Sequence, residues 1–314
     1  MLQKLKEQAL PIAIIIGVLF HNSIAILAPF IPGLVFIMLL LSFCSVSPKE
    51  MKFTRQHFLM LGIQISLSLV LYFTLLPVSR VIAQGVFICA LAPTAAAAAT
   101  ITAMLGGRVS FEASFVFLDN VMVALAAPLF FTWFGEYQDI PFGVSVFKIG
   151  SQVIPILIFP LLLAWLSERY AGKLHKWMIS VQWSTFYMWA AAIAVSAGQI
   201  SKFILEQDKT DYLEELVIAF ITLLLCLGQF RLGRLLGRRR HNYVGTEQAL
   251  GQKNTVLAIW MAQIYLNPVA AIGPGAYHLW QSCTNSYQLY VRNKRIRNRQ
   301  KRQQDRNKYH KKRF

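Results

Sequence analysis

Stretches of apolar residues long enough to cross a lipid bilayer recur along this chain, and few folds can accommodate them. A membrane-spanning helix needs roughly 20 consecutive residues that are mostly apolar. The 314 residues are 56% hydrophobic and only 14% charged, which is too little charge to cover the surface of a soluble domain. We therefore expect an all-α integral membrane protein that crosses the bilayer many times.

Loops rich in proline, glycine or charge divide the apolar sequence into ten predicted spans. Their approximate bounds are 11–27, 30–46, 57–76, 81–105, 110–133, 144–166, 178–200, 216–236, 246–266 and 268–290. A polar segment near the midpoint separates two five-helix units, 1–136 and 137–291, and a basic tail follows at 292–314. Because each unit makes an odd number of crossings, the two units are expected to form an inverted repeat.

Lysine and arginine are distributed unevenly between the predicted loops, and this asymmetry orients the chain. Counted from a cytoplasmic N-terminus, the inside loops carry most of the basic residues, whereas the acidic loop at 206–215 lies outside. The positive-inside rule then places both ends in the cytoplasm, as expected for a protein of the inner or plasma membrane. The formal charge of +17 comes largely from the tail, which we expect to contact anionic lipid. A nucleic-acid-binding arm is the weaker alternative, so no nucleic-acid partner is expected.

Two of the predicted spans are interrupted, and the interruptions occupy matching positions in the two units. In the ninth span, Gly251 is followed by the polar triplet Gln252-Lys253-Asn254. A charged side chain at membrane depth costs roughly 2.5–3.5 kcal/mol, so Lys253 is expected to face protein or water. In the fourth span, Pro93 precedes a run of alanines. We expect helix breaks at Pro93 and Gly251, a pattern that indicates the binding site of a secondary transporter.

These segments resemble the fourth and ninth helices of the bile acid:sodium symporter superfamily. The family's fourth-helix pattern, Pro-Gly-Gly-Thr-Ala-Ser-Asn, corresponds here to the sequence PTAAAAA at 93–99. Its ninth-helix pattern, Glu-x-Gly-x-Gln-Asn, corresponds to the sequence ALGQKN at 249–254. The resemblance implies ten helices in two inverted repeats, a panel and a core domain, and a fourth and ninth helix that break and cross at mid-membrane.

The chain departs from the family at positions that hold sodium. The residues at these positions are Ala98, Ala99, Ala249 and Lys253. Sodium needs several oxygen ligands in place of its hydration shell, and methyl groups supply none, while an ammonium group repels the ion. The departures therefore imply that the usual sodium sites are absent, and we expect no bound metal and no cofactor.

An arrangement of opposite charges takes the place of sodium in this interpretation. Glu112 and Asp119 are spaced along one face of the fifth predicted span. A buried lysine near a carboxylate can take part in proton transfer. Lys253 would then act as a tethered cation, with transport coupled to protons or to no ion. Two simpler interpretations stay open: Glu112 merely favours the helix N-terminus, and Asp119 is a structural partner of the lysine.

We expect the protein to carry a small organic anion by alternating access, with the anion bound where the broken helices cross. Polar residues of the predicted spans are further candidates for this site: Gln252, Asn254, Asn120 and Thr100. One alternative is a sodium-coupled symporter whose site is rebuilt from Glu112, Asp119 and Gln252. Another is a membrane receptor or scaffold that binds a ligand without transporting it. We do not expect an enzyme, because the sequence has no HExxH motif and no nucleophile elbow.

Overall fold

The computed structural model describes residues 12–44, 51–95, 97–135, 141–206, 212–238 and 242–311. Over these ranges the backbone is mostly helical, and no β-strand is present. Five helical segments are long and apolar enough to cross a membrane, namely His21–Phe43, α4 (Arg55–Leu75), α7 (Val109–Phe134), α8 (Phe142–Tyr170) and α11 (Tyr212–Arg238). The predicted all-α class is therefore confirmed, and these helices indicate a protein embedded in a membrane.

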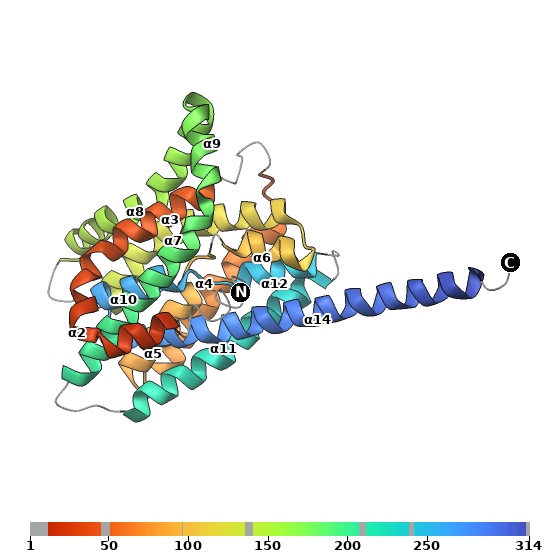
Figure 1. Ribbon diagram of the computed structural model, residues 1–314. Helices are drawn as coiled ribbons and strands as arrows, with labels where there is room; N and C mark the ends of the chain where they lie inside the picture. Colours follow the sequence, from red (N-terminus) through yellow and green to blue (C-terminus); the bar gives the residue numbers. More distant parts are fainter. Residues whose placement is uncertain are drawn as a thin grey trace.

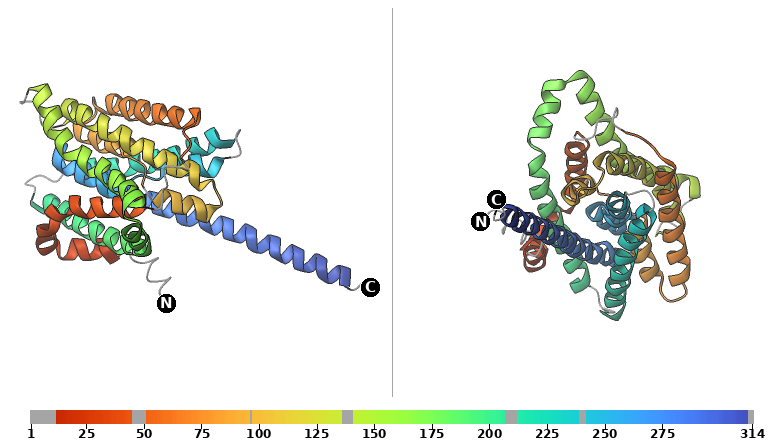
Figure 2. Two further views of the ribbon diagram at one scale, coloured as in Figure 1. Left: turned by 90° about the horizontal axis from the view of Figure 1, so that it is seen from above. Right: turned by 90° about the vertical axis from the view of Figure 1, so that its right-hand side faces the viewer.

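The first apolar segment combines α2 (His21–Ile24), the 3₁₀ helix η1 (Ala25–Phe30) and α3 (Ile31–Phe43). The other elements are α5 (Arg80–Leu91), α6 (Ala97–Leu105), α9 (Gly172–Ser180), η3 (Gln182–Ser184), α10 (Thr185–Glu206), α12 (Tyr243–Gly251), α13 (Thr255–Tyr265), η4 (Pro268–Ala271) and α14 (Ile272–Lys311). The helices pack into one bundle, from which α14 extends (Figure 1). The view from above shows the same extension (Figure 2).

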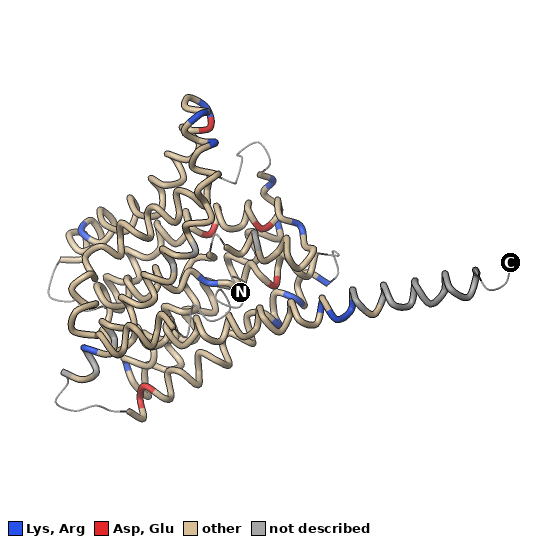
Figure 3. Tube along the Cα trace, viewed as in Figure 1, with Lys and Arg blue, Asp and Glu red and all other residues tan. Residues whose placement is uncertain are grey.

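The bundle consists of two groups of helices. In the first group, α3 packs against α8 and α10, and α2 lies against α10. In the second group, α4, α11 and α14 pack against α5, while α12 packs against α6, α7 and α11. The contact between α7 and α8 joins the two groups, and α13 packs against both, on α3 and α10 of the first and on α5 and α14 of the second. Charged residues lie mainly at helix ends and on α14 where it leaves the bundle (Figure 3).

Small residues bring α11 and α12 into close contact. Gly233 and Gly237 lie about one turn apart on α11, and a Cβ atom on either residue would overlap Thr246 of α12. Helix backbones approach this closely where the residues between them are small. Because α12 leads directly into the second interrupted segment, these two glycines help to set its position.

The first predicted boundary lies in the wrong place. The chain turns at Phe20 and is then helical from His21 to Phe43, so the expected gap at 28–29 is absent. Pro29 lies inside η1, and Pro32 occupies one of the first two positions of α3. Proline is tolerated where a helix starts, because its missing N–H group would have no intrahelical partner there.

The last helix is longer than the predicted tenth span. α14 continues without interruption to Lys311, whereas the sequence analysis placed the end of the span at 290 and a separate tail after it. The sequence after Gly275 contains neither proline nor glycine and is rich in lysine, arginine and glutamine, which favour helix. The last helix therefore continues through this basic sequence and extends beyond the bundle (Figure 1).

Candidate functional site

The first break separates α5 from α6. α5 ends at Leu91, and Ala92 adopts φ −46° and ψ 137°, in the extended region that is favoured before a proline. Pro93 follows and has no N–H group with which to continue the helix. The chain becomes helical again at Ala97. Proline chemistry thus favours a break at this position, between α5 and α6.

The second break separates α12 from α13. α12 ends at Gly251, and Gln252 is extended, with φ −94° and ψ 94°. Gly251 packs so tightly against Phe230 of α11 that a Cβ atom would overlap the aromatic ring. Asn254 caps the next helix, since its side-chain oxygen accepts a hydrogen bond from the N–H group of Leu257 at 3.3 Å. The polar triplet therefore ends one helix and starts another.

The two breaks cross and bind one another through their backbones. The N–H group of Ala95 donates to the carbonyl of Gln252 at 2.9 Å, and that of Asn254 donates to the carbonyl of Pro93 at 2.8 Å. The pairing is an isolated antiparallel β-bridge. Backbone groups without partners are costly inside a membrane. Each break supplies hydrogen-bond partners for backbone groups that the other break leaves without an intrahelical partner.

Lys253 lies at this crossing, and its side chain is buried. Its Nζ atom donates a hydrogen bond to Oε1 of Gln64 on α4, at 2.8 Å. The same amide donates from Nε2 to Oδ1 of Asp119 on α7, also at 2.8 Å. The lysine and the aspartate are therefore connected through the side chain of one glutamine.

Asp119 also holds the first break in place. Its Oδ2 atom accepts a hydrogen bond from the N–H group of Thr94 and lies within hydrogen-bond distance of the Thr94 hydroxyl, both at 2.7 Å. Asn120 donates from Nδ2 to the carbonyls of Thr94, at 3.3 Å, and of Val116, at 2.7 Å. The Thr94 hydroxyl also lies 2.7 Å from the carbonyl oxygen of Ala249 on α12. Two consecutive polar residues of α7 thus anchor the crossing.

A stripe of polar side chains on α14 runs along the second break. Gln281 accepts a hydrogen bond from the N–H group of Lys253 at 2.9 Å and donates one to its carbonyl at 3.2 Å. Asn285 donates to the side chain of Gln252 at 2.6 Å. The hydroxyl of Tyr277 donates to the last carbonyl of α12 at 2.9 Å. These contacts hold the end of α12 and the backbone of the lysine in place.

Other predicted residues lie outside this network. Glu112 is fully buried near the start of α7, and among the described residues neither of its carboxylate oxygens has a hydrogen-bond partner. Ala98 is buried at the start of α6, and Ala99 beside it is half-buried. Thr100 belongs to α6, but its side chain lies outside the described part of the structure. Asp119, and not Glu112, is therefore the carboxylate connected to the lysine.

Sequence reasoning missed the uncharged residues that connect the site. Gln64 and Gln281 both contact Lys253, and Thr94 bonds to Asp119. The available signal was a glutamine within an apolar segment, because a buried amide needs hydrogen-bond partners. That signal does not identify the partners, which lie far away along the chain.

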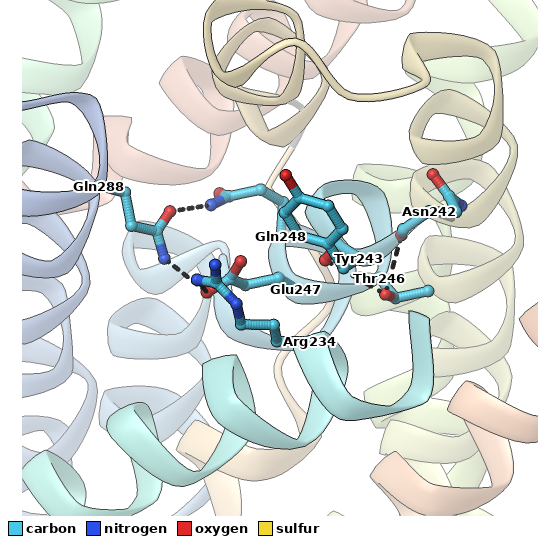
Figure 4. A network of polar contacts seen from close by, with 7 residues as sticks. All are labelled: Arg234, Asn242, Tyr243, Thr246, Glu247, Gln248 and Gln288. Carbon is cyan, nitrogen blue, oxygen red and sulfur yellow. Dashed lines mark hydrogen bonds and ion pairs between the residues drawn. The ribbon is translucent and has the colours of Figure 1, made fainter. Parts of the chain in front are cut away.

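A second polar network connects α11, α12 and α14 (Figure 4). Glu247 accepts hydrogen bonds from Arg234 at 3.4 Å and from Gln288 at 2.9 Å. Gln248 donates to the side chain of Gln288 at 2.8 Å. Two consecutive residues of α12 therefore bind one side chain of α14, which adds to the contacts that α14 makes along the second break.

Replacing Gln281 with leucine is expected to lower the free energy of unfolding by about 1–3 kcal/mol, because the buried N–H group of Lys253 loses its hydrogen-bond partner. Gln288→Leu is the comparison, since it also removes two side-chain hydrogen bonds but at a half-buried position. Thermal unfolding of the purified variants in detergent measures both effects. Equal losses of stability would argue against a special role for the contacts around Lys253.

The crossing combines a buried ammonium group and a buried carboxyl group with the first residues of two helices, α6 and α13. Such a site can bind an anion or exchange a proton. In the part of the chain that the structure describes, no group of three or more His, Cys, Asp or Glu side chains could hold a metal ion.

Comparison with models of known protein families finds no matching family, and comparison with curated proteins finds no significantly similar sequence. Inference about function therefore rests on the residues themselves and on their geometry.

Proposed function

We propose that the protein is a secondary active transporter that moves a small organic anion across the inner or plasma membrane by alternating access. In this proposal, ten spans form two inverted units, at 1–136 and 137–291, and both termini are cytoplasmic. The interrupted helix pairs α5–α6 and α12–α13 are the fourth and ninth spans. The main observation that supports the proposal is the crossing of their breaks. Discontinuous helices at matching positions form the binding sites of many transporters.

The chemistry of the crossing favours an anion as substrate. Lys253 contributes a positive charge, held by its hydrogen bond to Gln64. α6 and α13 begin beside the crossing, at Ala97 and Thr255, and the N-terminus of a helix carries a partial positive charge. An anionic group at the crossing would interact favourably with all three. The group that contains α3, α8 and α10 would then rock against the helices that hold the crossing.

Coupling in this proposal is to protons or to no ion. Alanine at 98, 99 and 249 supplies no side-chain oxygen for sodium at positions that hold the ion in the family that the chain resembles. One observation favours a second candidate, a sodium-coupled symporter with a rebuilt site. The buried carboxylate of Glu112 has no hydrogen-bond partner among the residues described, and carboxylate oxygens are good ligands for hard cations.

Uptake into proteoliposomes tests the proposal. Radiolabelled small carboxylates, sulfate esters and phosphate esters are offered in turn under an inward proton gradient, with sodium or with sodium replaced by N-methyl-D-glucamine. We expect accumulation of at least one of these classes, unchanged when sodium is replaced. Accumulation that requires sodium would select the rebuilt sodium site. Thermal stabilisation by an anion without accumulation would instead indicate a receptor or scaffold.

The Lys253→Met variant is expected to lose this uptake by about tenfold or more, which corresponds to about 1.4 kcal/mol of lost anion binding. Methionine retains an unbranched chain but removes the positive charge. Arg234→Met is the control, because it removes a cation from the second network and leaves the crossing intact. Initial rates are compared at low substrate concentration with equal amounts of monodisperse protein. Unchanged uptake by Lys253→Met would contradict a role for the ammonium group.

A further inference from the structure

The hydroxyl group of Thr94 has one hydrogen atom but two close acceptors. Its Oγ1 atom lies 2.7 Å from Oδ2 of Asp119 and 2.7 Å from the carbonyl oxygen of Ala249. Both distances are typical of an O–H···O hydrogen bond, yet a threonine hydroxyl donates a single such bond. A second hydrogen atom is therefore needed between these oxygens.

Asp119 is the group that can supply this hydrogen. A backbone carbonyl carries no proton, whereas a protonated carboxyl group has one O–H donor and keeps acceptor capacity. With a proton on Oδ2, Asp119 donates to Thr94, and Thr94 donates to Ala249. The N–H group of Thr94 still donates to Oδ2, and Gln64 still donates to Oδ1. Each of these contacts of Thr94 and Asp119 then has one donor and one acceptor.

Two charged or titratable groups face Asp119 from the elements around it. Lys253 lies on the second break, and its positive charge is connected to Asp119 through the amide of Gln64 on α4. Glu112 interacts electrostatically with Asp119 and lies on the same helix, α7, closer to its start. On α5, the thiol of Cys89 faces the lysine. Among the described groups that interact electrostatically with Asp119, Lys253 is therefore the positively charged one.

We propose that Asp119 is the proton-binding group of the transporter and that it takes up one proton together with each anion. The inference rests on the proposed transport function and specifies its coupling ion. The proton comes from the aqueous phase that the site faces, forms an O–H bond at Oδ2, and returns to water on the other side of the membrane when the anion leaves.

The charges at the crossing explain why the two ligands would bind together. When Asp119 is protonated it is neutral, and the ammonium group of Lys253 favours an anion as its counter-charge. When Asp119 is ionised, it balances the lysine through Gln64, and an anion is no longer favoured. Each ligand therefore strengthens the binding of the other by the same factor. The loaded and empty sites are both neutral overall, which avoids moving an uncompensated charge through the membrane.

Infrared difference spectroscopy of the purified protein between acidic and alkaline buffers tests the proposal without any substrate. A protonated carboxyl group has a carbonyl stretching band that disappears on ionisation. We expect a band in the wild type that survives in Glu112→Gln and is lost in Asp119→Asn. In Thr94→Val the band should move to higher frequency, because the O–H group loses its acceptor. Thr94→Ser retains the hydroxyl group and should leave the band in place.

A titrating band that is unchanged in Asp119→Asn, or the absence of any such band in the wild type, would overturn the proposal. If Asp119→Asn does not fold, the contrast between Thr94→Val and Thr94→Ser decides, and an identical band in both variants counts against the inference. The infrared result is separate from uptake. A band assigned to Asp119 without anion uptake would support the proton site and contradict the transport function. Anion uptake without such a band would support the transport function and contradict the proton site.

Discussion

Replacing Asp119 with alanine is expected to lower the free energy of unfolding by about 3–5 kcal/mol, as when one partner of a buried charge pair is removed. The variant removes the carboxyl group through which Gln64 connects Lys253 to α7. It also removes the acceptor for the N–H group of Thr94, which is buried at the first break. Unfolding by sodium dodecyl sulfate in mixed micelles, followed by circular dichroism, measures the loss.

Two further variants separate the effect of the charge on stability from the effect of removing a buried carboxyl group. Asp119→Ala combined with Lys253→Met removes both charges and should recover part of the stability, because an absent pair costs less than an unpaired charge. Glu112→Ala removes a carboxyl group that is equally buried but has no hydrogen-bond partner among the described residues. This variant should be less destabilised than Asp119→Ala. Equal losses in the two single variants would show that the connection to Lys253 contributes nothing to stability.

Gly233→Ala is expected to destabilise the protein by about 3 kcal/mol, at the upper end of the usual cost of overpacking. The added methyl group would overlap backbone atoms of Thr246 and Glu247, which cannot rotate away as a side chain can. α12 would have to shift away from α11 and carry the second break with it. Thermal unfolding measures the loss of stability, and anion uptake should fall in the same variant.

Gly228→Ala is the matched control for this substitution. It makes the same change on the same helix, but its methyl group would meet no atom within 4 Å outside its own helix. Helix propensity favours alanine over glycine by about 1 kcal/mol, so this variant should be at least as stable as the wild type. A similar loss in both variants would mean that the flexibility of glycine matters and that the contact with α12 does not.

The parts of the structure that the sequence predicts depend on local chemistry. Pro93 favours a break, because it lacks a donor and constrains the residue before it. Pro128, Pro155 and Pro160 lie within continuous helices, so proline alone does not fix where a break occurs. The polar triplet after Gly251 is recognisable because such residues are costly in an apolar span. The class of the fold follows in the same way from the apolar stretches.

The parts that the sequence did not predict depend on contacts between distant segments. Gln64 and Gln281 are uncharged, and nothing next to either residue indicates that it meets the backbone or side chain of Lys253. The spacing of Glu112 and Asp119 placed them on one helical face, but packing connects Asp119 to the lysine and leaves Glu112 apart. The turn at Phe20 carries no glycine or proline to signal it.

α14 gives the crossing a mechanical connection to the outside of the bundle. Gln281 bonds to the backbone of Lys253, and the same helix continues to Lys311 without a break. At 1.5 Å per residue, the helix from Gln281 to its end acts as a lever about 45 Å long. A tilt of about 10° at the crossing would move the far end of that lever by about 8 Å. A rearrangement too small to observe directly at the buried lysine is thereby amplified at a position that a spectroscopic label can reach.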